Sequence, residues 1–112
     1  MSAPRFGYLD RKRRAKVVSL LAAGGIAVLP TDTIYGFHCA VSRGDAVERI
    51  RRLKGRRGNE GFIVLAADCA MAAELVARWP GDSRRTLGAI WPAPLTAILP
   101  ARGARARAAS VR

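Results

Sequence analysis

The sequence predicts one small α/β domain in which helices flank a sheet. Half of its 112 residues are hydrophobic, enough to bury a core against the conformational entropy of the chain. The length is typical of one domain, and no repeat or linker divides it. Near the N-terminus a helical pattern, a pair of glycines and a short β-branched run follow one another, which is the rhythm of an α/β chain.

The first helix is expected to begin after Asp10, whose carboxylate can cap it. An apolar stripe at helical spacing follows. Its members are Val17, Leu20 and Leu21. The glycines at 24 and 25 supply a stop, and a buried strand is predicted over Ile26–Leu29. Pro30 ends this strand because it has no N–H for a sheet ladder.

A second helix is predicted to start within residues 42–45. Its expected buried face consists of Ala46, Val47, Ile50 and Leu53, and its expected wet side carries Arg49, Arg51 and Arg52. Glycines at 55, 58 and 61 interrupt any regular continuation, so we predict a cationic loop. The run Phe62–Leu65 then predicts a second strand.

Two more helices are predicted, one capped by Asp68 over residues 68–78 and one starting at Asp82 or Ser83 and ending near Ile90. A third strand is predicted over Leu95–Leu99. Beyond residue 100 the composition collapses to small residues and arginine, so residues 101–112 are expected to be a loop or tail.

The chain carries 20 Lys and Arg against 8 Asp and Glu, a formal net charge of +12, and 17 of the cations are arginine. Arginine suits phosphate and carboxylate oxygens, so the charge favours a polyanionic partner. A biased base composition, which coats solvated helix faces with arginine, is the better explanation for most of the individual arginines. No run reaches the roughly 18 apolar residues that a membrane span needs, so we expect a cytoplasmic protein without membrane contact.

Cys39 and Cys69 lie far apart without a CxxC pair, and His38 is the sole histidine. This pattern predicts reduced thiols and no zinc cage, so no metal ligand is assigned. A Cys39–His38 catalytic pair is disfavoured, because neighbours in an extended chain point to opposite sides.

A hydroxyl-rich turn, Pro30-Thr31-Asp32-Thr33-Ile34-Tyr35-Gly36, follows the first predicted strand. The ends of strands in α/β sheets are common ligand sites, and Thr31, Thr33 and Tyr35 could hold a small polar ligand by neutral hydrogen bonds. The alternative is a turn whose side chains only satisfy local backbone groups.

Three cations gather in Lys54-Gly55-Arg56-Arg57, at the end of the second predicted helix. They could simply complement the negative end of the helix dipole. Phosphate binding is favoured by the intervening glycine and by the glycine-punctuated loop. Neither a Walker loop nor GxGxxG is present, so a nucleotide site here would be of another kind.

These blocks, with Trp91-Pro92-Ala93-Pro94-Leu95-Thr96, resemble the YrdC-type threonylcarbamoyl-adenylate synthases in identity and order. The resemblance implies a YrdC-like twisted open mixed sheet with flanking helices, occupying residues 1–100 as the N-terminal portion of the family domain. It also implies a nucleotidyltransferase that condenses L-threonine, bicarbonate and ATP into threonylcarbamoyl-AMP and pyrophosphate for tRNA modification.

By this resemblance Thr31, Thr33 and Tyr35 would bind L-threonine, and Lys54 and Arg56 would hold the ATP phosphates, helped by Mg²⁺. Family domains run further and add a Ser/Asn-rich nucleotide motif, so we expect a truncated form with reduced or no activity. Exposed sheet edges would then favour self-association. The alternative function is a noncatalytic module that binds double-stranded RNA or tRNA.

Overall fold

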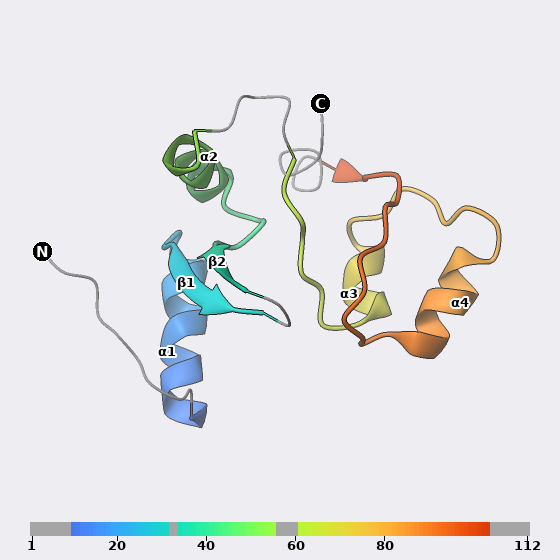
Figure 1. Ribbon diagram of the computed structural model, residues 1–112, viewed down its shortest axis with the longest axis horizontal. Helices are drawn as coiled ribbons and strands as arrows, with labels where there is room; N and C mark the ends of the chain where they lie inside the picture. The colour runs from blue at the N-terminus through green and yellow to red at the C-terminus, as the bar shows by residue number, and fades with distance from the viewer. Residues whose placement is uncertain (1–9, 32–33, 56–60, 104–112) are drawn as a thin grey trace, which may run out of the picture.

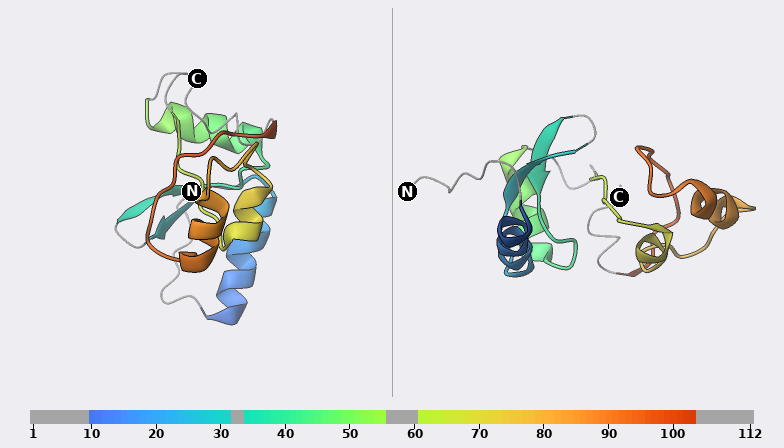
Figure 2. Two further views of the ribbon diagram at one scale, coloured as in Figure 1. Left: turned by 90° about the vertical axis from the view of Figure 1, so that its right-hand side faces the viewer. Right: turned by 90° about the horizontal axis from the view of Figure 1, so that it is seen from below.

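The computed structural model describes residues 10–31, 34–55 and 61–103. The elements are, in chain order, α1 (Arg11–Ala22), β1 (Ala27–Pro30), β2 (Tyr35–His38), α2 (Gly44–Leu53), α3 (Cys69–Ala73) and α4 (Ser83–Ile90). The α/β class is confirmed. Two groups of elements are visible, with α1, β1, β2 and α2 on one side, α3 and α4 on the other, and the extended segment 61–66 between them (Figure 1 and Figure 2).

Helix α1 starts and stops as predicted. The Asp10 carboxylate accepts a hydrogen bond from the Arg13 N–H at 2.8 Å, which caps the first turn. Gly24 has φ +92°, and the Gly25 N–H donates to the Leu20 carbonyl at 2.9 Å, which ends the helix. The apolar stripe is only partly buried. Val17 is buried, whereas Leu20 is 36% exposed.

Strands β1 and β2 form an antiparallel hairpin, the only sheet among the described residues. Leu29 pairs with Gly36, and His38 Nε2 lies 3.2 Å from the Leu29 carbonyl oxygen. The pairs Val28–Phe37 and Pro30–Tyr35 share the opposite face of the hairpin. All four of these side chains are exposed, so the hairpin presents an apolar face to solvent.

Helix α2 buries Ala46, Val47 and Ile50 as the pattern predicts. Two assignments on this helix are wrong. Leu53, predicted in the core, is 61% exposed because it is the last residue of the helix, beyond the packed turns. Arg51, predicted on the wet side, is only 4% exposed because Glu48 and the Phe62 ring cover it.

The strands predicted over Phe62–Leu65 and Leu95–Leu99 are wrong. Both segments are extended, but neither pairs with a described strand, and Ile63 is 72% and Ile98 97% exposed. A strand needs a partner for its backbone groups. The composition of each run therefore indicates an extended backbone, but it does not indicate whether a partner strand is present to form the hydrogen bonds of a sheet.

Helix α3 is shorter than predicted, ending at Ala73 instead of residue 78. Its cap is as expected, since the Asp68 carboxylate accepts from the Met71 N–H at 2.7 Å. After α3 the chain turns, and Val76 forms an isolated antiparallel bridge with Ala101. This pairing takes the backbone of residues 75–77 out of the helix. Helix α4 ends at Ile90 as predicted.

Candidate functional site

The hydroxyl-rich turn lies at the tip of the β1–β2 hairpin. The Thr31 backbone N–H and the Thr31 hydroxyl both donate to the Ile34 carbonyl, at 3.1 and 3.0 Å. The hydroxyl proton thus serves the turn, and the lone pairs of Oγ1 are left to accept from a ligand N–H. Tyr35 is 68% exposed opposite Pro30. Thr33 lies outside the described residues.

Lys54 immediately follows α2 and its side chain is exposed. Its backbone N–H donates to the Ile50 carbonyl at 2.9 Å, so the helical turn continues through it. Gly55 then adopts φ +63°, which turns the chain away from the helix axis. A cation in this place complements the helix dipole and is also open to an external phosphate. Arg56 lies outside the described residues.

The last two turns of α2 border a shallow, open recess of about 320 Å³ lined by Arg49, Arg52 and Leu53. The sequence analysis did not predict this recess. The repeated arginines just before Lys54 are the feature of the sequence that could have indicated it. Two guanidinium groups beside a recess extend the cationic surface that leads into Lys54.

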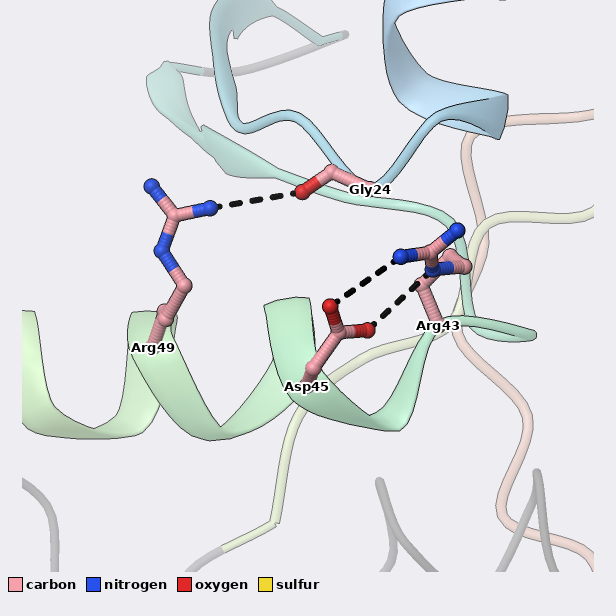
Figure 3. Close-up of polar contacts among 4 residues, drawn as sticks. All are labelled: Gly24, Arg43, Asp45 and Arg49. Atoms are coloured by element: carbon pink, nitrogen blue, oxygen red, sulfur yellow. Dashed lines mark hydrogen bonds and ion pairs between the residues drawn. The ribbon is translucent and has the colours of Figure 1, made fainter.

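Arg49 also joins the helix to the hairpin. Its Nη1 donates to the Gly24 carbonyl at 3.4 Å, across the turn between α1 and β1 (Figure 3). In the first turn of α2, the Arg43 guanidinium pairs with Asp45 at 3.1 Å. This hydrogen-bonded partner lowers the pKa of the Asp45 carboxyl below its ordinary value.

Segment 61–66 is attached to both sides of the molecule. At its start the Arg51 guanidinium stacks over the Phe62 ring at 4.9 Å. At its end the Ala66 carbonyl accepts from Trp91 Nε1 at 3.2 Å. Trp91 therefore uses its indole N–H to anchor the Trp-Pro-Ala-Pro turn to this segment. These contacts link the end of α2 to the third sequence block.

No hydrogen bond or ion pair within the described ranges joins Thr31 or Tyr35 to Lys54. What the structure brings together is the turn between α1 and β1 with α2, through Arg49, and α2 with Trp91, through segment 61–66. The meeting of the hydroxyl turn and Lys54 in one site stays a prediction.

The acidic, histidine and cysteine side chains are scattered over the part of the chain that the structure covers. No group of three or more His, Cys, Asp or Glu there could hold a metal ion. Cys39 and Cys69 are free and half-buried, and burial, assisted by the Asp45 charge, raises the pKa of the Cys39 thiol. Each helix described here is too short or too polar to span a bilayer.

Comparison with known proteins places these blocks in a family. Residues 19–111 match the Sua5/YciO/YrdC family, described as Telomere recombination. A threonylcarbamoyl-AMP synthase of Nitrosococcus oceani is 38% identical over 84 residues, covering 75% of this chain and 45% of the relative. The Halorhodospira halophila enzyme of that name is 38% identical over 81 residues, covering 72% of this chain and 42% of the relative.

A third relative, the threonylcarbamoyl-AMP synthase of Bacillus subtilis, is 33% identical over 86 residues, or 77% of this chain and 25% of the relative. The chain thus spans less than half the length of these curated relatives. No solved structure is significantly similar to it. The family match contains all three sequence blocks, and the chain belongs to the Sua5/YciO/YrdC family.

Proposed function

We propose that this chain takes part in making threonylcarbamoyl-AMP from L-threonine, bicarbonate and ATP, the activated intermediate of tRNA threonylcarbamoyladenosine modification. One observation carries the proposal: the match to named threonylcarbamoyl-AMP synthases lies in the family region that contains the hydroxyl turn, the Lys54 block and the Trp91 block. We assign the YrdC-like domain to residues 1–100, and the arginine-rich segment 101–112 follows it. We also propose that the protein acts in the cytoplasm, where its substrates are found.

The hydroxyl turn is assigned to L-threonine. Thr31 already donates its hydroxyl proton to Ile34, so its oxygen is poised to accept a hydrogen bond from the amino group of the substrate. Thr33 and Tyr35 are assigned to the same pocket, and the exposed ring of Tyr35 offers both an apolar wall and a hydroxyl.

Lys54 and Arg56 are assigned to the ATP phosphates. The threonine nitrogen first takes up bicarbonate with loss of water to give a carbamate. A carbamate oxygen then attacks the α-phosphorus, and the bond to the β-phosphate oxygen breaks to release pyrophosphate. This displacement needs no protein nucleophile, so the protein aligns the reactants and stabilises phosphate charge. Excluding water protects the labile carbamate.

Magnesium is expected as a companion of the ATP substrate. Its preferred ligands are carboxylate, phosphate and water oxygens. Lys54 and Arg56 offer only donors, so they fit the phosphates and not the cation. We therefore assign magnesium no protein ligand and derive no step from it.

The test uses the 112-residue chain with ATP, threonine and bicarbonate. We expect ATP and threonine each to bind, with threonine tightening the binding of ATP. Pyrophosphate release should require all three substrates. Absence of ATP binding, or release that is indifferent to threonine, would contradict the proposal.

A second candidate function is binding of tRNA or double-stranded RNA without catalysis. The observation in its favour is the surface of α1, where every basic side chain is exposed. These residues are Arg11, Lys12, Arg13, Arg14 and Lys16. RNA affinity should then fall steeply with salt, also after deletion of residues 101–112. Loss of the salt dependence on that deletion would assign the binding to the arginine-rich segment instead.

Self-association is proposed through the hairpin. Val28 is 60% and Tyr35 68% exposed on one face, and both strands have an unpaired edge within the described residues. The charge of +12 opposes this contact, so association should increase with salt. Sedimentation at low and high salt tests it, and a monomer at both would exclude it.

A further inference from the structure

Arg51 is the only buried charged side chain in the ranges that the structure describes, with 4% of its surface exposed. A charge is buried at a large cost unless partners replace its water. Its Nε donates to Glu48 Oε1 at 3.3 Å, and its guanidinium carbon lies 4.9 Å from the centroid of the Phe62 ring. The Phe62 ring, on a different segment of the chain, therefore contributes to the burial of this arginine.

The location of this contact sets it apart from an ordinary surface stack. Arg51 is three residues, or about one helical turn, before Lys54. Phe62 lies in the extended segment 61–66, the next stretch that the structure describes after Gly55. The contact therefore joins the end of α2, which Lys54 follows, to this segment.

The same segment is fixed at its far end. Trp91 Nε1 donates to the Ala66 carbonyl at 3.2 Å, so segment 61–66 is held at both ends. Release of Phe62 from Arg51 would remove a connection between the end of α2 and the Trp91 block. The Arg51–Phe62 contact thus contributes to the position of Lys54 relative to that block.

We propose that Arg51 and Phe62 are a positioning pair that holds Lys54 in register with the Trp91 block for binding a triphosphate. The inference rests on the proposed assignment of Lys54 to the ATP phosphates. Arg51 itself is a positioning residue, because its guanidinium is covered by protein and not open to ligand.

The molecule supplies a matched control. Arg84 stacks over Trp79 at 5.0 Å, the same kind of contact at nearly the same distance, on α4 and outside the three blocks. Arg84→Met and Arg51→Met each remove one positive charge and one arginine–aromatic stack. A general effect of lost charge would appear in both variants.

The first readout is the dissociation constant for ATP, measured by calorimetry on the full chain. Arg51→Met and Phe62→Leu should each weaken ATP binding about tenfold, and the double variant no further, because either change breaks the same contact. Threonine affinity should stay unchanged. Arg51→Lys and Phe62→Trp keep a cation over a ring and should recover most of the affinity, which also guards against variants that fail to fold.

The second readout needs no nucleotide. Exchange of the Lys54 and Gly55 amides should speed up in Arg51→Met and Phe62→Leu and not in Arg84→Met. Unchanged exchange at these amides, or unchanged ATP affinity in both variants while Lys54→Ala weakens it, would overturn the positioning pair. ATP binding that is indifferent to Lys54→Ala would instead overturn the proposed function.

Discussion

The two groups of elements in this protein are held together in different ways. In residues 10–55, a continuous hairpin ladder and an arginine bond to the turn after α1 connect the elements. In residues 61–103, two short helices and long extended segments are connected by one isolated bridge and a few hydrogen bonds. The first group contains a continuous strand ladder between neighbours in sequence, and the second is connected by single contacts between residues far apart in the chain.

This difference matters for the site, because its blocks fall in both groups. The hydroxyl turn and Lys54 belong to the first, and the Trp91 turn belongs to the second. Segment 61–66 connects them through Phe62 and Ala66. A site assembled in this way should be sensitive to the connecting contacts as well as to the groups that meet the ligand.

The largest effect is expected at Lys54, the residue of the first region that we propose binds the ATP phosphates. Lys54→Ala should lower ATP-dependent pyrophosphate release by roughly 100-fold, because it removes a cation from developing phosphate charge. Lys12→Ala removes an exposed lysine on α1 and should leave release unchanged. Equal losses in both variants would show that net charge matters and not Lys54.

Gly24→Ala should destabilise the first region by about 1–2 kcal/mol, because Gly24 has φ +92° and a left-handed backbone disfavours a side chain. The new Cβ would also lie 2.8 Å from Arg43 Nη2.

Gly88→Ala in α4 should stabilise the second region by about 0.5–1 kcal/mol, because the new Cβ would have no atom within 4 Å and alanine favours a helix over glycine. Amide exchange resolved by residue shows which region changes in stability. An equal change in exchange rates across the whole chain in either variant would contradict the assignment of each effect to its own region.

Asp68→Ala should cost the second region about 1 kcal/mol through loss of the cap on α3. Asp82→Ala is the control, since the Asp82 side chain makes no capping hydrogen bond to α4. Chemical denaturation compares the two variants. Equal destabilisation would contradict the assigned cap.

Trp91→Phe keeps an aromatic ring but removes the donor to the Ala66 carbonyl, so stability should fall by about 1 kcal/mol. Trp79→Phe retains the ring beneath Arg84 and should cost less. Chemical denaturation of the two variants measures the difference. An equal loss of stability in both would contradict the Trp91–Ala66 hydrogen bond as a link between the regions.

The smallest effect concerns Asp45. Its pKa is lowered in the folded chain by the hydrogen bond from Arg43, so its contribution to stability is present at neutral pH. That contribution is lost as pH falls from the ordinary carboxyl pKa, about 3.9, through the lower folded value. The melting temperatures of wild type and Asp45→Asn should therefore converge in acid, and a gap that is constant with pH would exclude the effect.

The difference between local and long-range contacts also explains what the sequence could predict. Caps and stops are local, so Asp10, Asp68 and Gly24 were identified correctly from their neighbours. The strands expected over 62–65 and 95–99 were wrong, because pairing depends on a distant partner that composition does not reveal. Burial of Arg51 was missed for the same reason, since its cover comes from Phe62 across the loop.

For the site, residue types were predictable and their spatial relations were not. The motif residues Thr31, Tyr35 and Lys54 are accessible, as ligand contacts must be. The turn role of the Thr31 hydroxyl appears only in the structure, because it depends on the path of the chain back to Ile34.

We propose that blocks from both regions form one site, and the decisive experiment is amide exchange of the full chain with and without ATP and threonine. Both ligands together should protect the hydroxyl turn, Lys54 and residues 91–96 at the same time. Protection confined to one region, with the other unchanged at saturating ligand, would contradict it.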